Sequence, residues 1–286
     1  MAKKYVLYNP HACSGRGEDH AKALKKRLDG EIVFTDITSI GTYEEFFSKM
    51  SEDDTLILCG GDGTLNRFIN ETSNMEIKNS VFYYPAGSGN DFAHDVGASV
   101  DGEPICIGEY IKDLPTVTID GKDSYFINGI GYGVDGYCCE EGDRLRALSE
   151  HPVDYTRIAI KGVLYKYKPT NATVTVDGVT KEYKKVWIAP TMNGRYYGGG
   201  MMPTPDQDRK NKEGMLSLMV FSGSGRLHTL AVFPSIFKGA HVKHKKIVEV
   251  LTGKDITVKF DSPRALQIDG ETVTGVTEYR ARGHKA

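Results

Sequence analysis

Hydrophobic residues in the first ~100 positions alternate between short continuous runs and runs spaced at three and four residues. Short continuous runs bounded by turn residues are typical of buried strands, whereas the wider spacing is typical of one helix face. The pattern therefore predicts the strand and helix order of a parallel sheet covered on both faces. The predicted strands are 4–9, 32–35, 55–59 and 81–84, and the predicted helices are 18–28, 43–50, one that follows 60–64 and a short one that follows 85–91.

Beyond about residue 116 the pattern changes to short alternating apolar runs separated by Asp-Gly pairs. Asp-Gly is a frequent two-residue hairpin turn, so the pairs at 120–121 and 177–178 predict antiparallel hairpins. A helix with spaced apolar positions is expected at 154–167. The predicted strands and hairpins are 117–122, 172–178, 186–189, 215–221, 256–260 and 273–280.

Together the two patterns predict a fold class of α/β followed by β. We expect an N-terminal parallel α/β domain at 1–125, with the C-terminal end of the chain as a further candidate for it. We expect an antiparallel β-sandwich domain at 126–286. In open parallel sheets, ligands bind beyond the carboxyl ends of the strands, so the loops that follow 4–9, 55–59 and 81–84 are the first candidates for a site.

Composition narrows the class of protein without identifying it. The chain has 286 residues, 40% of them hydrophobic and 26% charged, which fits two soluble domains. A net charge of -2 gives no support for nucleic-acid binding. We expect neither a membrane span nor a signal peptide, because the apolar runs are too short. The five cysteines show no Cys-x-x-Cys spacing, which favours reduced thiols and a cytoplasmic location.

The sequence Gly60-Gly61-Asp62-Gly63-Thr64 stands between a predicted strand and a predicted helix. Glycines let the backbone approach a bound group closely, and a helix start directs amide N–H groups at an anion. Asp62 adds a carboxylate, which fits a nearby metal ion or a hydroxyl that must be oriented. A tight turn capped by Asp62 is an equally weighted alternative for this loop alone.

Two further loops of the first domain carry similar residues. The loop at 9–17, Asn-Pro-His-Ala-Cys-Ser-Gly-Arg-Gly, offers amides for a phosphate and Arg16 as a cationic partner. An ordinary capped loop is the favoured alternative for it in isolation. The loop at 87–91, Gly-Ser-Gly-Asn-Asp, offers a hydroxyl, an amide and a carboxylate, and simple helix capping is the alternative.

Three segments of the second half stand out as well. Residues 193–201 include three consecutive glycines, which suggest close passage of the backbone or a flexible loop. Residues 212–217, Lys-Glu-Gly-Met-Leu-Ser, place an acid at a turn entering a strand. Residues 267–271, Gln-Ile-Asp-Gly-Glu, place two carboxylates around a glycine, and a hairpin turn is the favoured alternative. Combined, these loops supply the parts that phosphoryl transfer needs: amides and a cation for phosphates, acids for Mg²⁺, and one acid to accept a hydroxyl proton.

In this order the segments resemble the diacylglycerol kinase catalytic-domain family, which includes bacterial lipid kinases and sphingosine kinases. The resemblance runs from Tyr5 to about Glu271. It is carried by the motifs at 60–66, 85–93, 128–135, 198–201 and 269–271.

The resemblance implies a nucleotide-binding domain similar to those of phosphofructokinases and NAD kinases, and a β-sandwich domain that faces a lipid. It implies ATP and Mg²⁺ as cofactors. The implied catalytic residues are Asp62, Asp269 as general base, and Glu271 beside it. The implied nucleotide-binding residues are Asn9, Ser14, Gly15, Arg16, Gly60, Gly61, Gly63, Thr64, Asn66, Gly87, Ser88, Asn90 and Asp91. The implied metal-binding residues are Glu213 and Met215.

Two departures from the family pattern affect the implied accessory metal site. Relatives usually have Asp-Gly where this chain has Glu213-Gly214, and often Asp where it has Ser217. The segment at 203–212 also looks longer than usual and contains Asp206 and Asp208, either of which is able to substitute as a ligand.

We therefore expect in-line transfer of the γ-phosphoryl group of ATP to a lipid hydroxyl, with diacylglycerol giving phosphatidic acid as the default. The acceptor lies in a bilayer, so we expect a peripheral protein at the inner membrane face that contacts lipid through the basic run 238–246. A solvated basic loop is nearly as good an interpretation of that run. A homodimer stays open, and nucleic acid is not expected as a partner.

Other readings remain open at this point. An NAD kinase shares the loop at 60–64, but such enzymes carry an Asn-Glu pair where this chain has Asn90-Asp91. Sphingoid bases or monoacylglycerol are alternative acceptors. A non-catalytic nucleotide-binding regulator is a further alternative, although both Asp62 and Asp269 are present.

Overall fold

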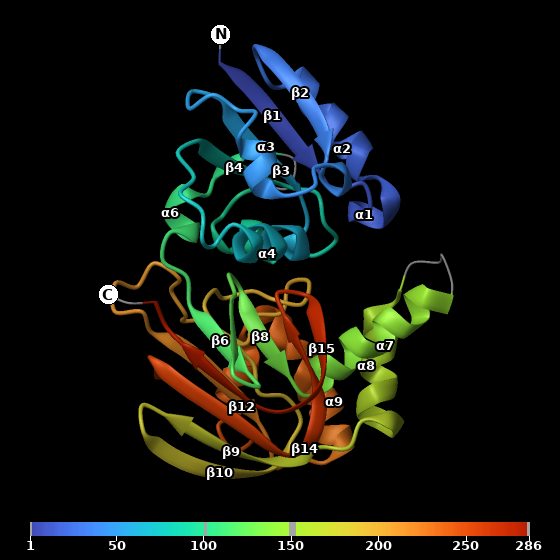
Figure 1. The fold of residues 1–286 in the computed structure, drawn as a ribbon. Coiled ribbons are helices and arrows are strands. Elements are labelled where there is room, and N and C mark those ends of the chain that lie inside the picture. Colours follow the sequence, from blue (N-terminus) through green and yellow to red (C-terminus); the bar gives the residue numbers. More distant parts are fainter. Residues whose placement is uncertain (1, 100–101, 149–152, 285–286) are drawn as a thin grey trace. The chain divides into compact units, whose positions relative to one another are not determined.

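A computed structural model describes residues 2–99, 102–148 and 153–284. The chain divides into two compact units, Met1–Asp113 and Leu114–Ala286 (Figure 1). The division falls earlier than the boundary we predicted after residue 125, because the hairpin at 116–125 pairs with the last strand of the chain and so belongs to the second unit. The C-terminal end also stays in the second unit.

The described part of the first unit contains a five-stranded sheet in the order β2-β1-β3-β4-β5, parallel except for β5. Its strands are β1 (Lys3–Tyr8), β2 (Glu31–Asp36), β3 (Thr55–Gly60), β4 (Ser80–Pro85) and β5 (Ile105–Cys106). Its helices are α1 (Ala12–Gly15), α2 (Gly17–Ala23), η1 (Leu24–Lys26), η2 (Ile37–Ser39), α3 (Tyr43–Phe47), α4 (Asp62–Glu71), α5 (Asp91–Asp95) and α6 (Gly108–Ile111).

The central strands of this sheet are buried on both faces, which explains their continuous apolar runs. Every residue of β3 after Thr55 is buried. Helix α4 packs on the sheet with Leu65, Phe68 and Ile69, which lie on one face of the helix. The predicted parallel α/β architecture is confirmed, but two helices are shorter than predicted. The helix expected at 18–28 ends as α2 and η1, and the one expected at 43–50 ends at Phe47.

In the second unit the described strands form a ten-stranded antiparallel sheet. The strands are β6 (Thr116–Ile119), β7 (Lys122–Tyr125), β8 (Gly129–Tyr132), β9 (Thr170–Val176), β10 (Val179–Val186), β11 (Thr191–Met192), β12 (Leu216–Phe221), β13 (Val248–Gly253), β14 (Asp255–Ile268) and β15 (Glu271–Arg282). The helical segments are α7 (Val134–Leu148), α8 (Tyr155–Lys161), the π-helical turn η3 (Gly162–Lys166), α9 (Arg226–Val232), η4 (Phe233–Lys238) and η5 (Ala240–Lys243).

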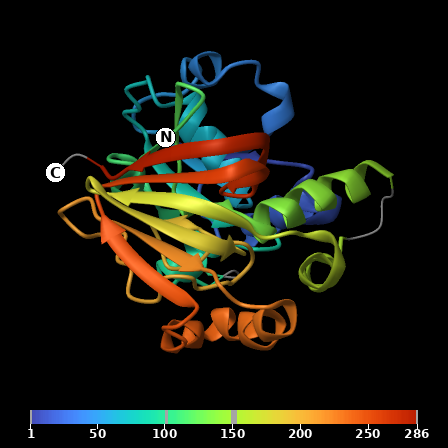
Figure 2. The same cartoon turned by 90° about the horizontal axis from the view of Figure 1, so that it is seen from below.

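This sheet folds over so that its parts pack against each other as layers. Strand β14 pairs with β9 in its first half and with β8 in its second half, with register shifts between Lys259 and Leu266. One large apolar cluster joins side chains from β8, β9, β12, β14 and β15. A second cluster lies between β12 and the helical segments, because alternate β12 residues face opposite sides. Figure 2 shows α7 and α8 along one edge of the unit and the segment containing α9, η4 and η5 along another.

The predicted antiparallel domain is confirmed, with local corrections. The segment expected as a strand at 186–189 is not a regular strand beyond Val186; Ile188 forms isolated bridges to Gly133 and Phe221 instead. Strands β8 and β13 and helices α7 and α9 were not predicted. The helix expected at 154–167 is α8 followed by η3.

Candidate active site

In the first unit, the two glycine-rich loops that follow β3 and β4 run in direct backbone contact. The amide of Ala86 donates to the carbonyl oxygen of Gly60 at 2.8 Å. A Cβ added to Gly87 would lie 2.6 Å from the Cα of Gly61, which is shorter than real Cβ contacts. Glycine is therefore required here for close approach of one loop to the other.

The carboxylate of Asp62 joins these loops from the side. Its Oδ2 accepts a hydrogen bond from the amide of Asp91, and its Oδ1 accepts one from the amide of Phe92, both at 3.0 Å. These amides belong to the first turn of α5, where a carboxylate is favourable. Asp62 is thus a cap, as one sequence interpretation held, but it caps the helix of the neighbouring loop.

Asn90 closes the second loop onto itself. Its side-chain oxygen accepts from the amide of Gly87 and its side-chain nitrogen donates to the carbonyl of Gly87, both at 2.8 Å. The residue adopts a left-handed conformation with φ of 55° and is buried. Asp91 is buried beside it, whereas Ser88 is exposed.

The loop after β3 ends where α4 begins, at Asp62. The first helical hydrogen bond runs from the amide of Leu65 to the carbonyl of Gly61, so the amides of Asp62, Gly63 and Thr64 have no acceptor within the helix. Such a helix start favours an anion. The prediction that the glycine-rich loop at 60–64 leads into the start of a helix is confirmed.

The loop after β1 reaches the same helix. The side-chain amide of Asn9 donates to the hydroxyl of Thr64 at 2.9 Å, and its oxygen accepts from the amide of His11. Asn66, one residue further into α4 than Leu65, is buried. The loops that follow β1, β3 and β4 therefore offer backbone and side-chain amides together with the carboxylates of Asp62 and Asp91.

The remaining residues of the first loop lie on α1 and at its end. Gly15 has a φ of 86°, which favours glycine. Arg16 is exposed and its guanidinium contacts the sulfur of Cys13 at 3.4 Å. The side chain of Ser14 lies outside the described part of the structure. Arg16 is thus the one described cationic side chain among the predicted nucleotide-binding residues.

In the second unit, Asp269 stands in the turn between β14 and β15 with a φ of 48°. Its Oδ2 accepts from the amide of Ile127 at 2.6 Å, and its Oδ1 accepts from the amides of Asn128 and Gly129 at 2.8 and 2.9 Å. The side chain is buried, with 4% exposure. Glu271, two residues on, is exposed. The carboxylate therefore anchors the turn to the segment that enters β8.

The two predicted metal-binding residues do not fit a cation site. The side chain of Glu213 is exposed, and the carbonyl oxygen of Met215 already accepts from the side-chain amides of Gln207 and Asn211, each at 2.9 Å. Within 2–99, 102–148 and 153–284, no three His, Cys, Asp or Glu side chains gather as metal ligands. The accessory metal site implied by the resemblance is therefore not supported by these residues.

Two polar groups of the second unit were not singled out from the sequence. Asp135 is buried at the start of α7, where burial raises the pKa of its carboxyl to about 6 while the hydroxyl of Tyr197 donates to it at 3.1 Å. Arg209 donates to the carbonyl of Ile127 and to the side chain of Asn128 at 3.1 and 3.0 Å. Asp135 lay inside the recognised motif 128–135, but nothing in the sequence marks Arg209.

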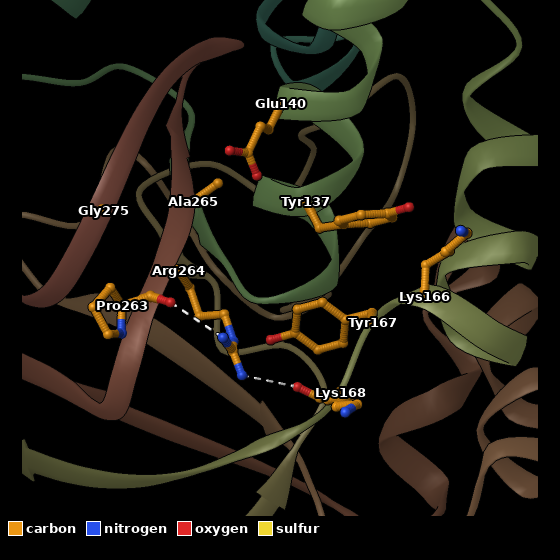
Figure 3. A pocket seen from close by; sticks show the side chains of 9 residues that line it. All are labelled: Tyr137, Glu140, Lys166, Tyr167, Lys168, Pro263, Arg264, Ala265 and Gly275. Atoms are coloured by element: carbon orange, nitrogen blue, oxygen red, sulfur yellow. Dashed lines mark hydrogen bonds between the residues drawn. The ribbon is translucent and has the colours of Figure 1, made fainter.

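A pocket of about 330 Å³ lies in the second unit, between α7, the end of η3 and strands β14 and β15. Figure 3 shows the residues that line it. Its arginine, Arg264, donates to the carbonyls of Pro263 and Lys168 and lies over the ring of Tyr167. None of the predicted site residues lines it. We do not include this pocket in the candidate site, because the guanidinium of Arg264 is already bound by main-chain oxygens.

Comparison with known proteins identifies the class of protein. Residues 3–117 match the diacylglycerol kinase catalytic domain, and residues 128–281, more than half of the chain, match the YegS C-terminal NAD kinase β-sandwich-like domain. The chain belongs to the diacylglycerol kinase catalytic-domain family and is a kinase that transfers phosphate to an alcohol group.

Individual relatives agree with this assignment. A diacylglycerol kinase of Mycobacterium tuberculosis is 28% identical over 218 residues, which cover 73% of this chain and 67% of the relative. A diacylglycerol kinase of Bacillus subtilis is 22% identical over 283 residues, covering 95% and 90%. A crystal structure of a diacylglycerol kinase from Bacillus anthracis str. Sterne aligns with a TM-score of 0.59 at 19% identity, covering 99% and 94%, which shows the shared fold.

Proposed function

We propose that this protein transfers the γ-phosphoryl group of ATP, with Mg²⁺, to the hydroxyl of a lipid, and that diacylglycerol is the preferred acceptor and phosphatidic acid the product. The observation that carries the proposal is the carboxylate of Asp62, which ties two glycine-rich loops together at the start of α4. Relatives named diacylglycerol kinase support the choice of acceptor.

The nucleotide phosphates would lie against the amides of 61–64, with Asn9, Asn66 and the loop at 87–91 around them and Arg16 as a counter-charge. Mg²⁺ in nucleotide sites is held by one or two carboxylates together with the substrate's phosphates. Asp62 and Asp91 are the carboxylates of these loops and would hold such an ion, which would neutralise charge on the phosphates.

Asp269 would accept the proton of the lipid hydroxyl, with Glu271 next to it. The three amides that bind its carboxylate hold it in one position, which meets the geometric requirement for a general base. The same contacts complicate a simple test, since Asp269→Asn removes an acceptor for backbone amides and lowers stability as well as basicity.

Asp177→Asn tests the same substitution at a similar but exposed turn. Asp177 also precedes a glycine, has a φ of 47°, and one of its oxygens accepts from the amides of Lys254 and Asp255 at 2.9 Å. Asp269→Asn loses a buried acceptor and should cost about 1–3 kcal/mol of unfolding free energy, whereas Asp177→Asn keeps an acceptor for its two amides and should cost less. Only Asp269→Asn should lower kcat, by about 10²- to 10⁴-fold.

The experiment combines radiolabelled ATP with a panel of diacylglycerol, monoacylglycerol, a sphingoid base and NAD in mixed micelles. We expect phosphatidic acid as the main product of the wild-type protein. Near-normal turnover by Asp269→Asn would reject the base assignment, and product from NAD alone would replace the lipid kinase proposal. Lack of turnover with every acceptor would favour a nucleotide-binding regulator.

We also propose that the helical edge of the second unit attaches to an anionic lipid surface. Segments 155–168 and 222–247 together carry nine Lys and Arg residues and no Asp or Glu, in a chain of net charge -2. Helix α9 packs against both η3 and η4, so these segments are neighbours. Among the described residues, no helix is both long enough and apolar enough to span a bilayer.

The same edge exposes several large apolar side chains. Tyr165 is 74% exposed, Leu227 80% and Phe237 49%. Exposed apolar groups beside basic ones fit the boundary between lipid headgroups and acyl chains. This surface extends the basic run 238–246 that we selected from the sequence.

Vesicle sedimentation tests the attachment. Replacing Lys243, Lys245 and Lys246 by Glu should release the protein from vesicles containing phosphatidylglycerol, since each lysine contributes about 1 kcal/mol near an anionic leaflet. The control replaces three exposed lysines at 122, 184 and 254 by Glu, with the same change in charge. Equal loss in both variants would show a general charge effect, and unchanged binding would remove the basic run 238–246 from the account of membrane attachment.

A further inference from the structure

The segment 203–217 of the second unit contains Glu213 and Met215, the two residues for which the family resemblance implies an accessory cation. Met215 and Ser217 line a cavity of about 820 Å³ together with Gln207, Asp206 and Asp208. The aspartates that we considered as substitute ligands are exposed, and Asp208 accepts from the amide of Lys210 as a local turn. Neither aspartate contributes to a group of metal ligands in the described residues.

Gln207 occupies the centre of this segment and is 6% exposed. Its side-chain nitrogen donates to the carbonyl oxygens of Asn193 and Met215, at 3.2 and 2.9 Å. Its side-chain oxygen accepts from the hydroxyl of Ser217 at 2.6 Å. The side-chain amide of Gln207 therefore links the loop at Asn193 to the segment 215–217.

Asn211 acts in the same way at the turn. Its side-chain oxygen accepts from the amide of Met215 at 2.6 Å, and its side-chain nitrogen donates to the carbonyl of Met215 at 2.9 Å and to that of Asp208. The carbonyl oxygen of Met215 thus receives two N–H donors. A carbonyl oxygen has two lone pairs, so both are used.

We propose that the side-chain amides of Gln207 and Asn211 replace the accessory cation in this chain, so that this part of the second unit is held together without metal. A cation and an N–H group both present positive charge to a carbonyl oxygen, and the neutral amide achieves this without carboxylate ligands. The proposal concerns stability and is independent of the proposed lipid kinase activity.

Ser217 explains why the replacement involves several positions. A carboxylate at 217 would face the side-chain oxygen of Gln207, and two acceptors cannot bond to each other. A hydroxyl can donate to that oxygen instead. The observed orientation of the Gln207 amide therefore requires a donor such as Ser at 217.

Thermal unfolding of the full-length protein without nucleotide tests this proposal. Neither EDTA nor millimolar Mg²⁺ or Ca²⁺ should change the Tm of the wild-type protein. Gln207→Ala should lower the Tm by about 4–8 °C in every condition, because buried carbonyl oxygens and a hydroxyl lose their partner. Asn171→Ala, which removes an exposed amide pair with Asp261 in the same unit, should change it by less than about 2 °C.

A gain-of-metal variant completes the test. Gln207→Glu combined with Ser217→Asp introduces two carboxylates beside the carbonyl of Met215, so the Tm of this variant should rise with Mg²⁺ or Ca²⁺ and fall again with EDTA. A wild-type Tm that drops by several degrees in EDTA and recovers with Mg²⁺ would overturn the proposal. A neutral effect of Gln207→Ala would overturn it as well.

Discussion

Carboxylates of this protein differ in how their charge is compensated. Half-buried Asp62 accepts hydrogen bonds from two backbone amides, and buried Asp269 accepts them from three. Asp135 is as buried as Asp269, and although it also accepts backbone hydrogen bonds, its removal from water is the larger effect and raises the pKa of its carboxyl to about 6. The buried charge of Asp135 therefore costs stability at neutral pH.

The first prediction follows from this raised pKa. The folded-state pKa of Asp135 exceeds its ordinary value of 3.8, so its favourable contribution is complete below pH 3.8 and is lost as pH rises through about 6. Asp135→Asn keeps the shape and an acceptor for the Tyr197 hydroxyl. Relative to the wild-type protein, the variant should gain about 2 kcal/mol of unfolding free energy between pH 4 and pH 7.

Urea unfolding at the two pH values measures this difference. Asp143→Asn is the control, because Asp143 lies on the same helix, is exposed and pairs with Arg146. That control should change by less than about 1 kcal/mol. An Asp135→Asn variant whose relative stability does not depend on pH would show that the carboxyl titrates normally in the folded protein.

The second prediction concerns Arg209, whose guanidinium contacts Ile127 and Asn128, the residues whose amides bind Asp269. Without these two hydrogen bonds the segment at 127–128 should shift, and the carboxylate of Asp269 should shift with it. A small displacement of a catalytic group lowers the rate of the chemical step. Arg209→Ala and Arg209→Lys should both lower kcat by about 10- to 100-fold with little change in the KM for ATP.

Steady-state kinetics with lipid in mixed micelles, together with a thermal melt, measures the effect of Arg209. Lys210→Ala is the control, because Lys210 is the next residue along the chain and is exposed. Should Arg209→Ala lower the Tm while kcat stays normal, the side chain would have a structural role only.

At the scale of elements, apolar runs predicted the strands well wherever both faces are covered. Strand β3 is buried along its length, and β12 alternates between two apolar clusters, so both give unbroken hydrophobic runs. The pattern failed for β8, Gly129–Tyr132, because two of its four residues are glycines that make room for neighbours. A Cβ on Gly131 would lie 1.7 Å from the carboxylate of Asp135, a constraint that no local pattern contains.

The third prediction belongs to the pair of loops that follow β3 and β4. Gly87→Ala places a methyl group 2.6 Å from the Cα of Gly61, so the loops must separate and the cap formed by Asp62 is disturbed. We expect at least about a tenfold loss in ATP affinity, equivalent to about 1.4 kcal/mol. Calorimetric titration with a non-hydrolysable ATP analogue measures it.

Gly108→Ala is the matched control for Gly87→Ala, because a Cβ there meets nothing within 4 Å and its φ is not in the left-handed region. It should bind the analogue as the wild-type protein does. Equal affinity in all three proteins would remove the contact between the two loops from the account of nucleotide binding.

At the scale of the whole molecule, the sequence predicted the kinds of loops better than their contacts. The motif at 60–64 located a helix start, but not that Asp62 would cap α5 from 29 residues away. Likewise, Glu213 and Met215 were selected by motif position, whereas the side chains that bind the carbonyl of Met215 are those of Gln207 and Asn211, which no motif marked. Long-range hydrogen bonds depend on tertiary packing, which residue spacing along the chain does not encode.

The fourth prediction follows from the division of the chain into two units. The two apolar clusters described above draw all their residues from the second unit, and a further one, around Val6, Ile57 and Tyr84, draws all of its residues from the first. The chain passes between the units once, at Asp113–Leu114. A fragment of about 170 residues with two apolar clusters is large enough to fold alone. The fragment that begins at Leu114 should therefore unfold cooperatively, with a native-like near-ultraviolet circular dichroism spectrum.

Nucleotide then separates the roles of the units. MgATP stabilises whichever unit binds it, by an amount that grows with its concentration relative to Kd. It should raise the Tm of the full-length protein and leave the fragment unchanged, because the amide-rich loops belong to the first unit. A fragment that binds dye as a molten globule would show that the second unit needs the first, and a fragment stabilised by MgATP would move the nucleotide site into the β-rich unit.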